Sequence, residues 1–224
     1  MNANSKKNGI FTTIKVKNAI PFFLEFHLKR LKIEERRDLV LQKIDYLQKE
    51  NNQVTYALKI IVENGYILFE TRALPTNTAV SAISYTTKKL LPVVKQTDRT
   101  IYEKAKQKAQ KDNAQEAIFV DKNNILETTI ANLVSEEKGQ LITPTLTKQG
   151  LKGITRQILL NSGLVIEKDI PISIEYPLLA INCLRIMQIE KMDNKTLPSS
   201  KSLYKQVSKI LQKAEEEYAN SYNR

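Results

Sequence analysis

Apolar runs of strand length alternate with amphipathic stretches of helical period along this chain, and this order limits its fold more than any other feature. In the first half, the pattern predicts, in chain order, a strand at Ile10–Val16, a helix opened by Pro21, a helix at Leu39–Leu47, and strands at Val54–Val62, Tyr66–Glu70 and Val80–Tyr85. The Asn64-Gly65 pair is typical of a hairpin turn. Grouped strands separated by helices favour the α+β class.

The second half continues in the same way. Its pattern predicts a helix at Thr100–Lys111, strands at Glu116–Asp121, Ile125–Thr129, Asn132–Ser135 and Gln140–Thr143, a short helix within Gly150–Gly163, strands at Val165–Asp169 and Ala180–Met187, and a closing helix from about Ser202. The region Leu74–Lys95 holds two prolines and little periodicity, which is typical of a connection. We therefore expect two α+β domains, residues 1–90 and residues 91–224.

The chain holds one histidine, His27, and one cysteine, Cys183, and this scarcity excludes several kinds of site. An internal disulfide and a His/Cys metal centre need more of these residues. Ser-His-Asp catalysis is disfavoured because no acid is spaced to work with His27, to which we assign a structural role. No apolar run approaches the ~20 residues of a membrane helix. The polar start from Met1 to Ile10 lacks the apolar core of a signal peptide, and we expect a cytoplasmic protein.

A net charge of +11 raises the alternative of a non-enzymatic basic domain that binds nucleic acid. The lysines and arginines, however, concentrate in helical stretches such as Lys29–Lys43 and Lys104–Lys111, without the interleaved aromatic residues that stack on bases. We therefore interpret them as solvated helix faces and disfavour nucleic acid as a partner. A basic surface also attracts small anionic molecules, so charge alone does not identify the ligand.

Six groups of short motifs follow one another between Phe11 and Arg185. They are Phe11-Thr12-Thr13 with His27-Leu28-Lys29-Arg30-Leu31, Lys95-Gln96-Thr97-Asp98-Arg99 with Tyr102, Glu116–Asp121, Leu126–Leu133, Thr143-Pro144 with Leu151–Arg156, and Asn182-Cys183-Leu184-Arg185. In this order they resemble the class IV aminotransferases, the fold type IV pyridoxal phosphate enzymes. The resemblance implies a two-domain fold like that of D-amino acid aminotransferase, pyridoxal 5'-phosphate as cofactor, and a homodimer.

The resemblance also implies a shortened N-terminus. Members of the family usually begin with a further strand pair and a glycine-rich approach to the Phe-x-Thr strand, whereas only Asn8-Gly9 stands directly before this strand here. The additional segment helps to shape the substrate pocket and the subunit contact. Two interpretations stay open: a chain trimmed at its start, or a divergent homologue with altered or lost activity.

Lys95 and Glu127 take the central roles that the resemblance implies. Lys95 matches the lysine that holds the cofactor as a Schiff base, and the neighbouring apolar run Leu90–Val94 predicts desolvation that lowers the pKa of its amine. Glu127 matches the carboxylate that keeps the ring nitrogen protonated, so that the ring accepts electrons from a substrate carbanion. The rival lysines Lys88 and Lys89 lack this context and are interpreted as a solvated strand end.

The resemblance assigns a second set of residues to the cofactor phosphate. Arg30 matches the arginine that contacts it, and a planar guanidinium suits bidentate binding. Gly153, Ile154 and Thr155 stand where a turn enters a helix, a position at which free backbone N–H groups and the helix dipole attract anions. Cys183 replaces the serine of the related loop, and because a thiol is a weak donor, a phosphate contact there depends on backbone N–H groups.

Two motifs lean toward one reaction within the family. Phe11-Thr12-Thr13 and Asn182-Cys183-Leu184-Arg185 resemble 4-amino-4-deoxychorismate lyases more than transaminases. The resemblance then implies that Lys95 removes a ring proton, that Thr13 faces the substrate and assists proton movement, and that a small anionic substrate yields pyruvate and 4-aminobenzoate, a folate precursor. The alternative is a class IV aminotransferase acting on branched-chain or D-amino acids.

Overall fold

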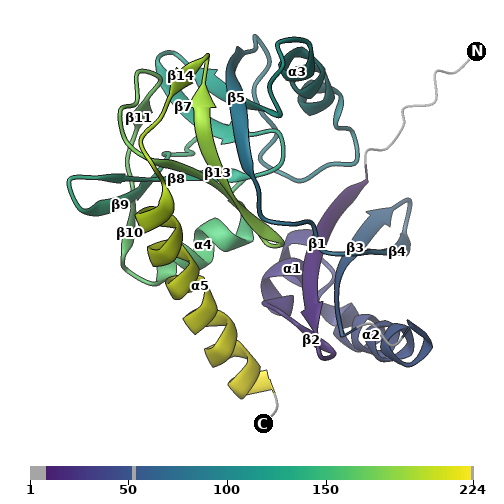
Figure 1. The fold of residues 1–224 in the computed structure, drawn as a ribbon. Coiled ribbons are helices and arrows are strands. Elements are labelled where there is room, and N and C mark those ends of the chain that lie inside the picture. Colours follow the sequence, from purple (N-terminus) through teal and green to yellow (C-terminus); the bar gives the residue numbers. More distant parts are fainter. Residues whose placement is uncertain (1–8, 52–53, 223–224) are drawn as a thin grey trace, which may run out of the picture. The chain divides into compact units, whose positions relative to one another are not determined.

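The computed structural model describes residues 9–51 and 54–222 and divides the chain into two compact units (Figure 1). Of the described residues, 9–75, 94–99 and 218–222 belong to the first unit, and 76–93 and 100–217 to the second. Residues 1–8, which form most of the polar start used in the sequence analysis, lie outside the described part.

The first unit is an antiparallel sheet covered on one face by helices. Its elements are β1 (Ile10–Lys17), β2 (Ile20–Pro21), α1 (Leu24–Leu31), the 3-10 helix η1 (Glu34–Arg36), α2 (Arg37–Asn51), β3 (Thr55–Glu63) and β4 (Tyr66–Arg72). The strand order is β2-β1-β3-β4. Ile14 and Val16 of β1 and Leu58 of β3 pack with Leu28 of α1 and Ile44 of α2, so the helices bury one face of the pleat. Phe11, Thr13 and Lys15, which alternate with these residues along β1, belong to the other face.

The first helix begins later than the sequence predicted. Pro21 ends the two-residue strand β2 instead of opening a helix, and Phe23 takes a left-handed conformation with φ 59° directly before α1. The hydroxyl of Tyr218, from the C-terminal helix, accepts the N–H of Leu24 at 3.1 Å. A distant side chain thus caps this helix, and no local sequence signal marks its first turn.

The second unit is built on a ten-stranded sheet. Its elements are β5 (Ala79–Thr86), α3 (Thr100–Lys111), β6 (Glu116–Asp121), β7 (Asn124–Thr128), β8 (Asn132–Glu137), β9 (Gln140–Thr143), α4 (Ile154–Asn161), β10 (Val165–Glu167), β11 (Ile170–Pro171), β12 (Leu178–Asn182), β13 (Arg185–Met192), β14 (Lys195–Thr196) and most of α5 (Lys201–Tyr222). The main strand order is β10-β9-β8-β12-β13-β5-β6-β7-β11, with β14 beside β13.

Six of these strands form a closed ring. β8, β12, β13, β5, β6 and β7 pair in succession, and an additional pairing of Glu127 with Asn132 joins β7 back to β8. All six strands contribute residues to one core cluster, among them Ile118, Leu133 and Ile189. The ring therefore closes between Glu127 and Asn132, two residues of one sequence motif.

Helices pack against the strands of the second unit through alternate residues. Phe119 of β6 packs with Ala105 of α3. Its neighbour Ile118 belongs to the core cluster that the strands of the ring share. Leu179 of β12 packs in the same way with residues of α4 and α5 such as Leu203. Strands buried on both faces read as continuous apolar runs, as the sequence of Glu116–Asp121 does.

The boundaries of the two units differ from the predicted domains. β5, which the sequence analysis placed in residues 1–90, lies between β13 and β6 in the second unit and runs parallel to both. Lys95, which it placed in residues 91–224, belongs to the first unit. Pairing between residues distant in sequence decides both assignments, and sequence periodicity carries no information on such pairing.

The predicted single strand at Ala180–Met187 is two strands. β12 and β13 are antiparallel and turn at Cys183 and Leu184, where the Asn182 side chain accepts the N–H groups of Leu184 at 2.9 Å and Arg185 at 3.1 Å. An asparagine side chain that bonds the backbone just after itself favours a turn even inside an apolar run. This signal was present in the sequence and was missed.

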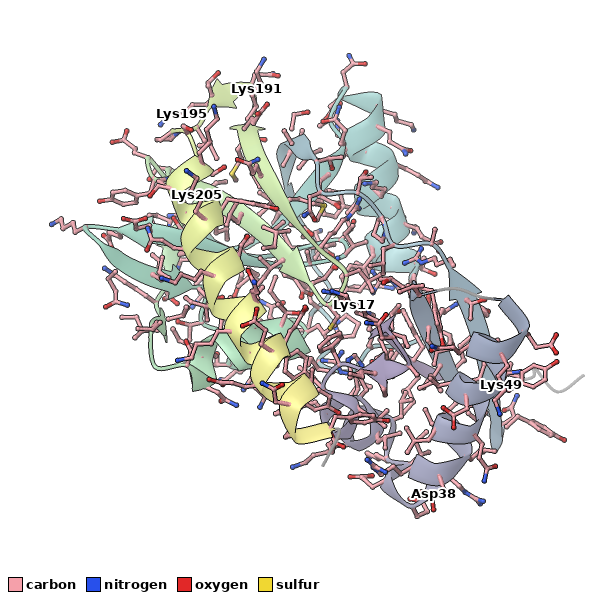
Figure 2. All side chains as sticks on the ribbon, turned by 60° about the horizontal axis from the view of Figure 1, so that its bottom comes forward. Lys17, Asp38, Lys49, Lys191, Lys195 and Lys205 are labelled. Carbon is pink, nitrogen blue, oxygen red and sulfur yellow. The ribbon has the colours of Figure 1, made fainter. Side chains whose placement is uncertain are left out.

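Many lysines of the second unit are exposed. Figure 2 shows Lys205 on α5 and Lys191 and Lys195 on the β13–β14 hairpin, with side chains that point away from the fold. In the part of the chain that the structure describes, no helix combines the length and apolar composition needed to cross a membrane.

Candidate active site

Lys95 is held at the start of β1 by backbone pairing. Its carbonyl accepts the N–H of Phe11 at 2.9 Å, Gln96 forms an antiparallel bridge with Ile10, and Thr97 donates its N–H to the Gly9 carbonyl at 2.8 Å. The Lys95 Nζ lies 5.0 Å from the centroid of the Phe11 ring. Phe11 belongs to the face of the sheet that the helices leave uncovered, so the ammonium lies on this face.

The apolar surroundings that the sequence predicted for Lys95 are not those of the fold. Leu90, Val93 and Val94 are exposed, and only Leu91 of this run is buried. Lys95 itself is half-buried, and the aromatic ring of Phe11 is the apolar group beside its amine. The prediction that this run desolvates Lys95 is wrong because residues that are adjacent in a loop need not be buried together.

Thr13 and Arg30 belong to the same unit as Lys95. Thr13 follows Phe11 by two residues on β1, so the two side chains share a face, and it pairs with Lys59 of β3. Arg30 is half-buried near the end of α1. The first unit therefore gathers three of the predicted site residues: the candidate lysine, the candidate phosphate arginine and the candidate substrate threonine.

His27 is a buried neutral base close to these cations. Its side chain is 1% exposed, and its Nδ1 lies 2.6 Å from the Thr12 hydroxyl in a hydrogen bond. Burial lowers the pKa of His27 well below its usual value of 6.5, and the positive charges of Arg30 and then Lys95 lower it further. Both cations therefore lie near enough to His27 to act on its charge.

This lowered pKa predicts that the folded protein loses stability in mild acid. Unfolded His27 takes up a proton near pH 6.5, whereas folded His27 remains neutral, so the unfolded state binds more protons as pH falls below 6.5. The stabilisation is complete above pH 6.5, and the free energy of unfolding should fall by about 1 kcal/mol between pH 6.5 and 5.5. Urea unfolding at a series of pH values measures this slope.

The control for this prediction is His27→Gln, which can hydrogen-bond Thr12 but does not titrate. Because His27 is the single histidine of the chain, no other histidine contributes to this pH range. The variant should lose most of the slope between pH 6.5 and 5.5. An equal slope in the variant and the parent protein would contradict the buried neutral state of His27.

In the second unit, Glu127 is a buried carboxylate held by two donors. Its side chain is 3% exposed, Oε1 accepts the Tyr102 hydroxyl at 2.9 Å, and Oε2 accepts the N–H of Leu151 at 3.0 Å. Glu127 is therefore a buried group and not a solvated surface charge. These two bonds fix the orientation of the carboxylate.

The turn before α4 approaches Glu127 closely and depends on glycine. Gly150 has φ +86°, and a Cβ there would lie 2.9 Å from a Leu146 methyl and 3.7 Å from the Glu127 carboxyl carbon. A side chain is thus excluded by both conformation and space.

Gly153 follows as the residue before α4. Its N–H donates to the Asn132 Oδ1 at 3.0 Å, and no side chain caps the helix. Ile154 and Thr155 are buried in the first turn, where N–H groups have no acceptor within the helix. These are the groups that the sequence analysis assigned to phosphate, and the helix dipole favours an anion beside them.

Cys183 lies in the turn between β12 and β13 and is half-buried. Asn182, the residue before it, donates its side-chain N–H to the Ile130 carbonyl at 3.3 Å. Ile130 belongs to the segment between Glu127 and Asn132. Hydrogen bonds therefore join the Cys183 turn, the Glu127 segment and the turn before α4 within the second unit.

Tyr102 and Asn132 have no role that could be predicted from the sequence, although both lie in the motifs of the family resemblance. Tyr102 donates to the Glu127 carboxylate, and Asn132 bonds the turn before α4. A tyrosine in a helix and an asparagine at a strand start have ordinary interpretations, so only the fold distinguishes their roles. In the part of the chain that the structure describes, no group of three His, Cys, Asp or Glu residues is placed to hold a metal ion.

Several solved structures share this fold. A candidate 4-amino-4-deoxychorismate lyase from Legionella pneumophila has a TM-score of 0.77 and 20% sequence identity, covering 92% of this chain and 91% of its own. A fold IV-transaminase from Curtobacterium pusillum has a TM-score of 0.77 and 18% identity, covering 90% and 84%. A hypothetical aminotransferase from Mycobacterium tuberculosis in its PLP-bound form has a TM-score of 0.75 and 18% identity, covering 93% and 89%. The α+β, fold type IV prediction is thereby confirmed.

No curated protein matches the chain. The family model described as amino-transferase class IV matches residues 9–174, which hold both Lys95 and Glu127. This match covers more than half of the chain and confirms the family resemblance inferred from the motifs. The chain belongs to the class IV aminotransferase family, whose members are enzymes that use pyridoxal phosphate.

Proposed function

We propose that this enzyme converts 4-amino-4-deoxychorismate to 4-aminobenzoate and pyruvate. The observation that carries the proposal is the face shared by Thr13 and Lys95: the lysine amine lies 5.0 Å from the Phe11 ring centroid, and Thr13 is the next residue of β1 on that face. A hydroxyl on the side of a lysine amine suits proton transfer during an elimination. The candidate lyase from Legionella pneumophila and the transaminase from Curtobacterium pusillum both share the fold, so the fold is compatible with the lyase but does not select it.

The residues of both units fit pyridoxal phosphate by their chemistry. When bound, the cofactor supplies an aldehyde that captures amines and a ring that accepts electrons from an adjacent carbanion. Lys95, a half-buried residue, offers an amine for the aldehyde, and Glu127 offers a buried carboxylate for the ring nitrogen. By the family resemblance, Arg30 and the N–H groups of Gly153 to Thr155 offer donors for the phosphate.

In this proposal each residue has a defined task. Lys95 would hold the cofactor through its amine, and once the substrate amine had taken that place, the Lys95 Nζ would remove the proton from the ring carbon that bears this amine. The bond from the ring to the enolpyruvyl oxygen breaks, and the enol takes up a proton to become pyruvate. Thr13 assists this proton transfer. Glu127 keeps a proton on the ring nitrogen, and no oxidant or keto acid is consumed.

The reaction itself provides the test. Given 4-amino-4-deoxychorismate and no keto acid, the enzyme should release 4-aminobenzoate and pyruvate in equal amounts, because an elimination needs no acceptor for the amino group. Fluorescence of 4-aminobenzoate and a lactate dehydrogenase assay for pyruvate measure the two products.

The result that contradicts the proposal is a transaminase pattern. If leucine, glutamate or D-alanine bleached the cofactor absorbance and 2-oxoglutarate or pyruvate restored it, the lyase assignment would be wrong. In that case the family membership would stand, and an aminotransferase of branched-chain or D-amino acids would replace the lyase. The homodimer and the cytoplasmic location stay predictions of the family resemblance.

A further inference from the structure

We propose that Asn132 is a positioning residue for the cofactor phosphate and acts through the turn of residues 151–153 before α4. The inference rests on the proposed function, because that turn and the helix after it are assigned to the phosphate there. Asn132 has no direct chemical task in this proposal. Its side chain fixes the shape of the backbone that carries the phosphate donors.

The Asn132 side chain bonds both ends of the turn. Its Nδ2 donates to the Leu151 carbonyl at 2.8 Å, and its Oδ1 accepts the N–H of Gly153 at 3.0 Å. Asn132 is 5% exposed, so water does not readily replace either bond. An amide is the side-chain group that offers a donor and an acceptor side by side in one plane. The two bonds therefore define the path of the chain between Leu151 and Gly153.

Gly153 is shaped to receive this amide. A Cβ built on Gly153 would lie 2.0 Å from the Asn132 Oδ1, much closer than any real contact. The conformation of Gly153 is extended, with φ −64° and ψ 149°, and other residues adopt it easily. Glycine is therefore needed here because a larger residue would prevent the close approach of the Asn132 amide oxygen.

Asn132 and Glu127 also form one frame. They are the register pair that joins β7 to β8, and the Glu127 Oε2 accepts the N–H of Leu151, whose carbonyl Asn132 binds. One strand pair thus holds the carboxylate assigned to the ring nitrogen and the turn assigned to the phosphate. Because the pyridine ring and its phosphate are linked by a short arm, a fixed separation between these two groups favours binding of both ends together.

Removing the amide should weaken phosphate binding specifically. Asn132→Ala leaves the Leu151 carbonyl and the Gly153 N–H without their partner, and the turn relaxes to satisfy them elsewhere. The N–H groups of Ile154 and Thr155 then lose their common direction. We expect the affinity for pyridoxal phosphate to fall on the order of tenfold more than the affinity for pyridoxal, which lacks the phosphate.

The experiment compares these two probes on the full chain freed of cofactor. Titrations with pyridoxal phosphate and with pyridoxal, followed by the absorbance of the lysine-bound form, give two dissociation constants, and their ratio reports the phosphate contribution. The control is Ser135→Ala, on the same strand, which loses the buried bond from its hydroxyl to the Pro177 carbonyl at 2.7 Å. A general loss of strand stability should change the ratio by less than twofold.

A second variant guards against misfolding. Asn132→Asp keeps the size of the side chain and the acceptor for Gly153, but it cannot donate to Leu151 and adds a negative charge. Asn132→Asp should reduce the preference for pyridoxal phosphate over pyridoxal at least as much as Asn132→Ala does. Equal weakening of both probes in the Asn132 variants would overturn this inference alone, while a parent protein that attaches neither probe to lysine would overturn the proposed function with it.

Discussion

Lys95→Ala is expected to abolish the attachment of pyridoxal phosphate and nearly all turnover. The parent protein should be yellow after dialysis, and borohydride should fix the cofactor to the peptide that contains Lys95. Without the amine there is neither a covalent attachment point nor a base for the substrate proton, and the loss of rate should be on the order of 10⁴-fold. Absorbance after dialysis, peptide mass spectrometry and initial rates measure the three effects.

Two matched variants test whether the attachment needs the reactive amine of Lys95 or only a positive charge near Phe11. Lys95→Arg keeps a cation on the Phe11 face, but a guanidinium does not deprotonate, so the attachment should still be lost. Lys59→Ala removes the other ammonium over the same ring, at 5.4 Å from the Phe11 centroid, and should keep the borohydride label. Lys88 and Lys89 are exposed residues of the second unit. A borohydride label on either of them would contradict the assignment of the attachment to Lys95.

Local periodicity predicts most elements of this fold because each has a clear pattern. The helix Thr100–Lys111 and the strands Glu116–Asp121 and Gln140–Thr143 have the predicted bounds. The turn between β12 and β13 had a local signal in Asn182 that was missed, whereas two other failures depend on residues far away in sequence. Tyr218 caps the first helix, and β5 joins the second unit by pairing with β6 and β13. Such contacts leave no trace in a window of ten or fifteen residues.

The candidate site shows the same limit. The motifs identify Lys95 and Glu127 by their order in the chain, and the family match supports that order. Neither their burial nor their partners could be predicted, because both depend on tertiary packing. Asn132 is the clearest case, since its role follows from two bonds to residues about twenty positions later. The sequence therefore identifies the motifs that form the candidate site, and the fold shows which contacts each residue of a motif makes.

Glu127→Gln is expected to keep the cofactor and lose about 10²-fold in rate. Glutamine is nearly the same size, its carbonyl oxygen can accept the N–H of Leu151, and its amide can donate to the Tyr102 oxygen once that hydroxyl rotates. The buried bonds are thus retained, and folding should be preserved. A neutral amide, however, does not keep a proton on the ring nitrogen, and a lost electrostatic contact of this kind costs 10²–10³-fold in rate.

Glu116→Gln provides the matched control for this prediction. Glu116 is another buried carboxylate of the second unit, 1% exposed, which accepts the N–H of Ala117 and the hydroxyl of Thr129 and has no assigned task at the cofactor. Both variants remove one buried negative charge, so a difference in rate between them reports position rather than charge burial. We expect Glu116→Gln to stay within a few-fold of the parent rate, with comparable melting temperatures for both variants. Equal rates for Glu127→Gln and the parent protein would assign Glu127 to folding alone, whereas a shifted cofactor spectrum in Glu127→Gln only would locate the carboxylate at the ring nitrogen.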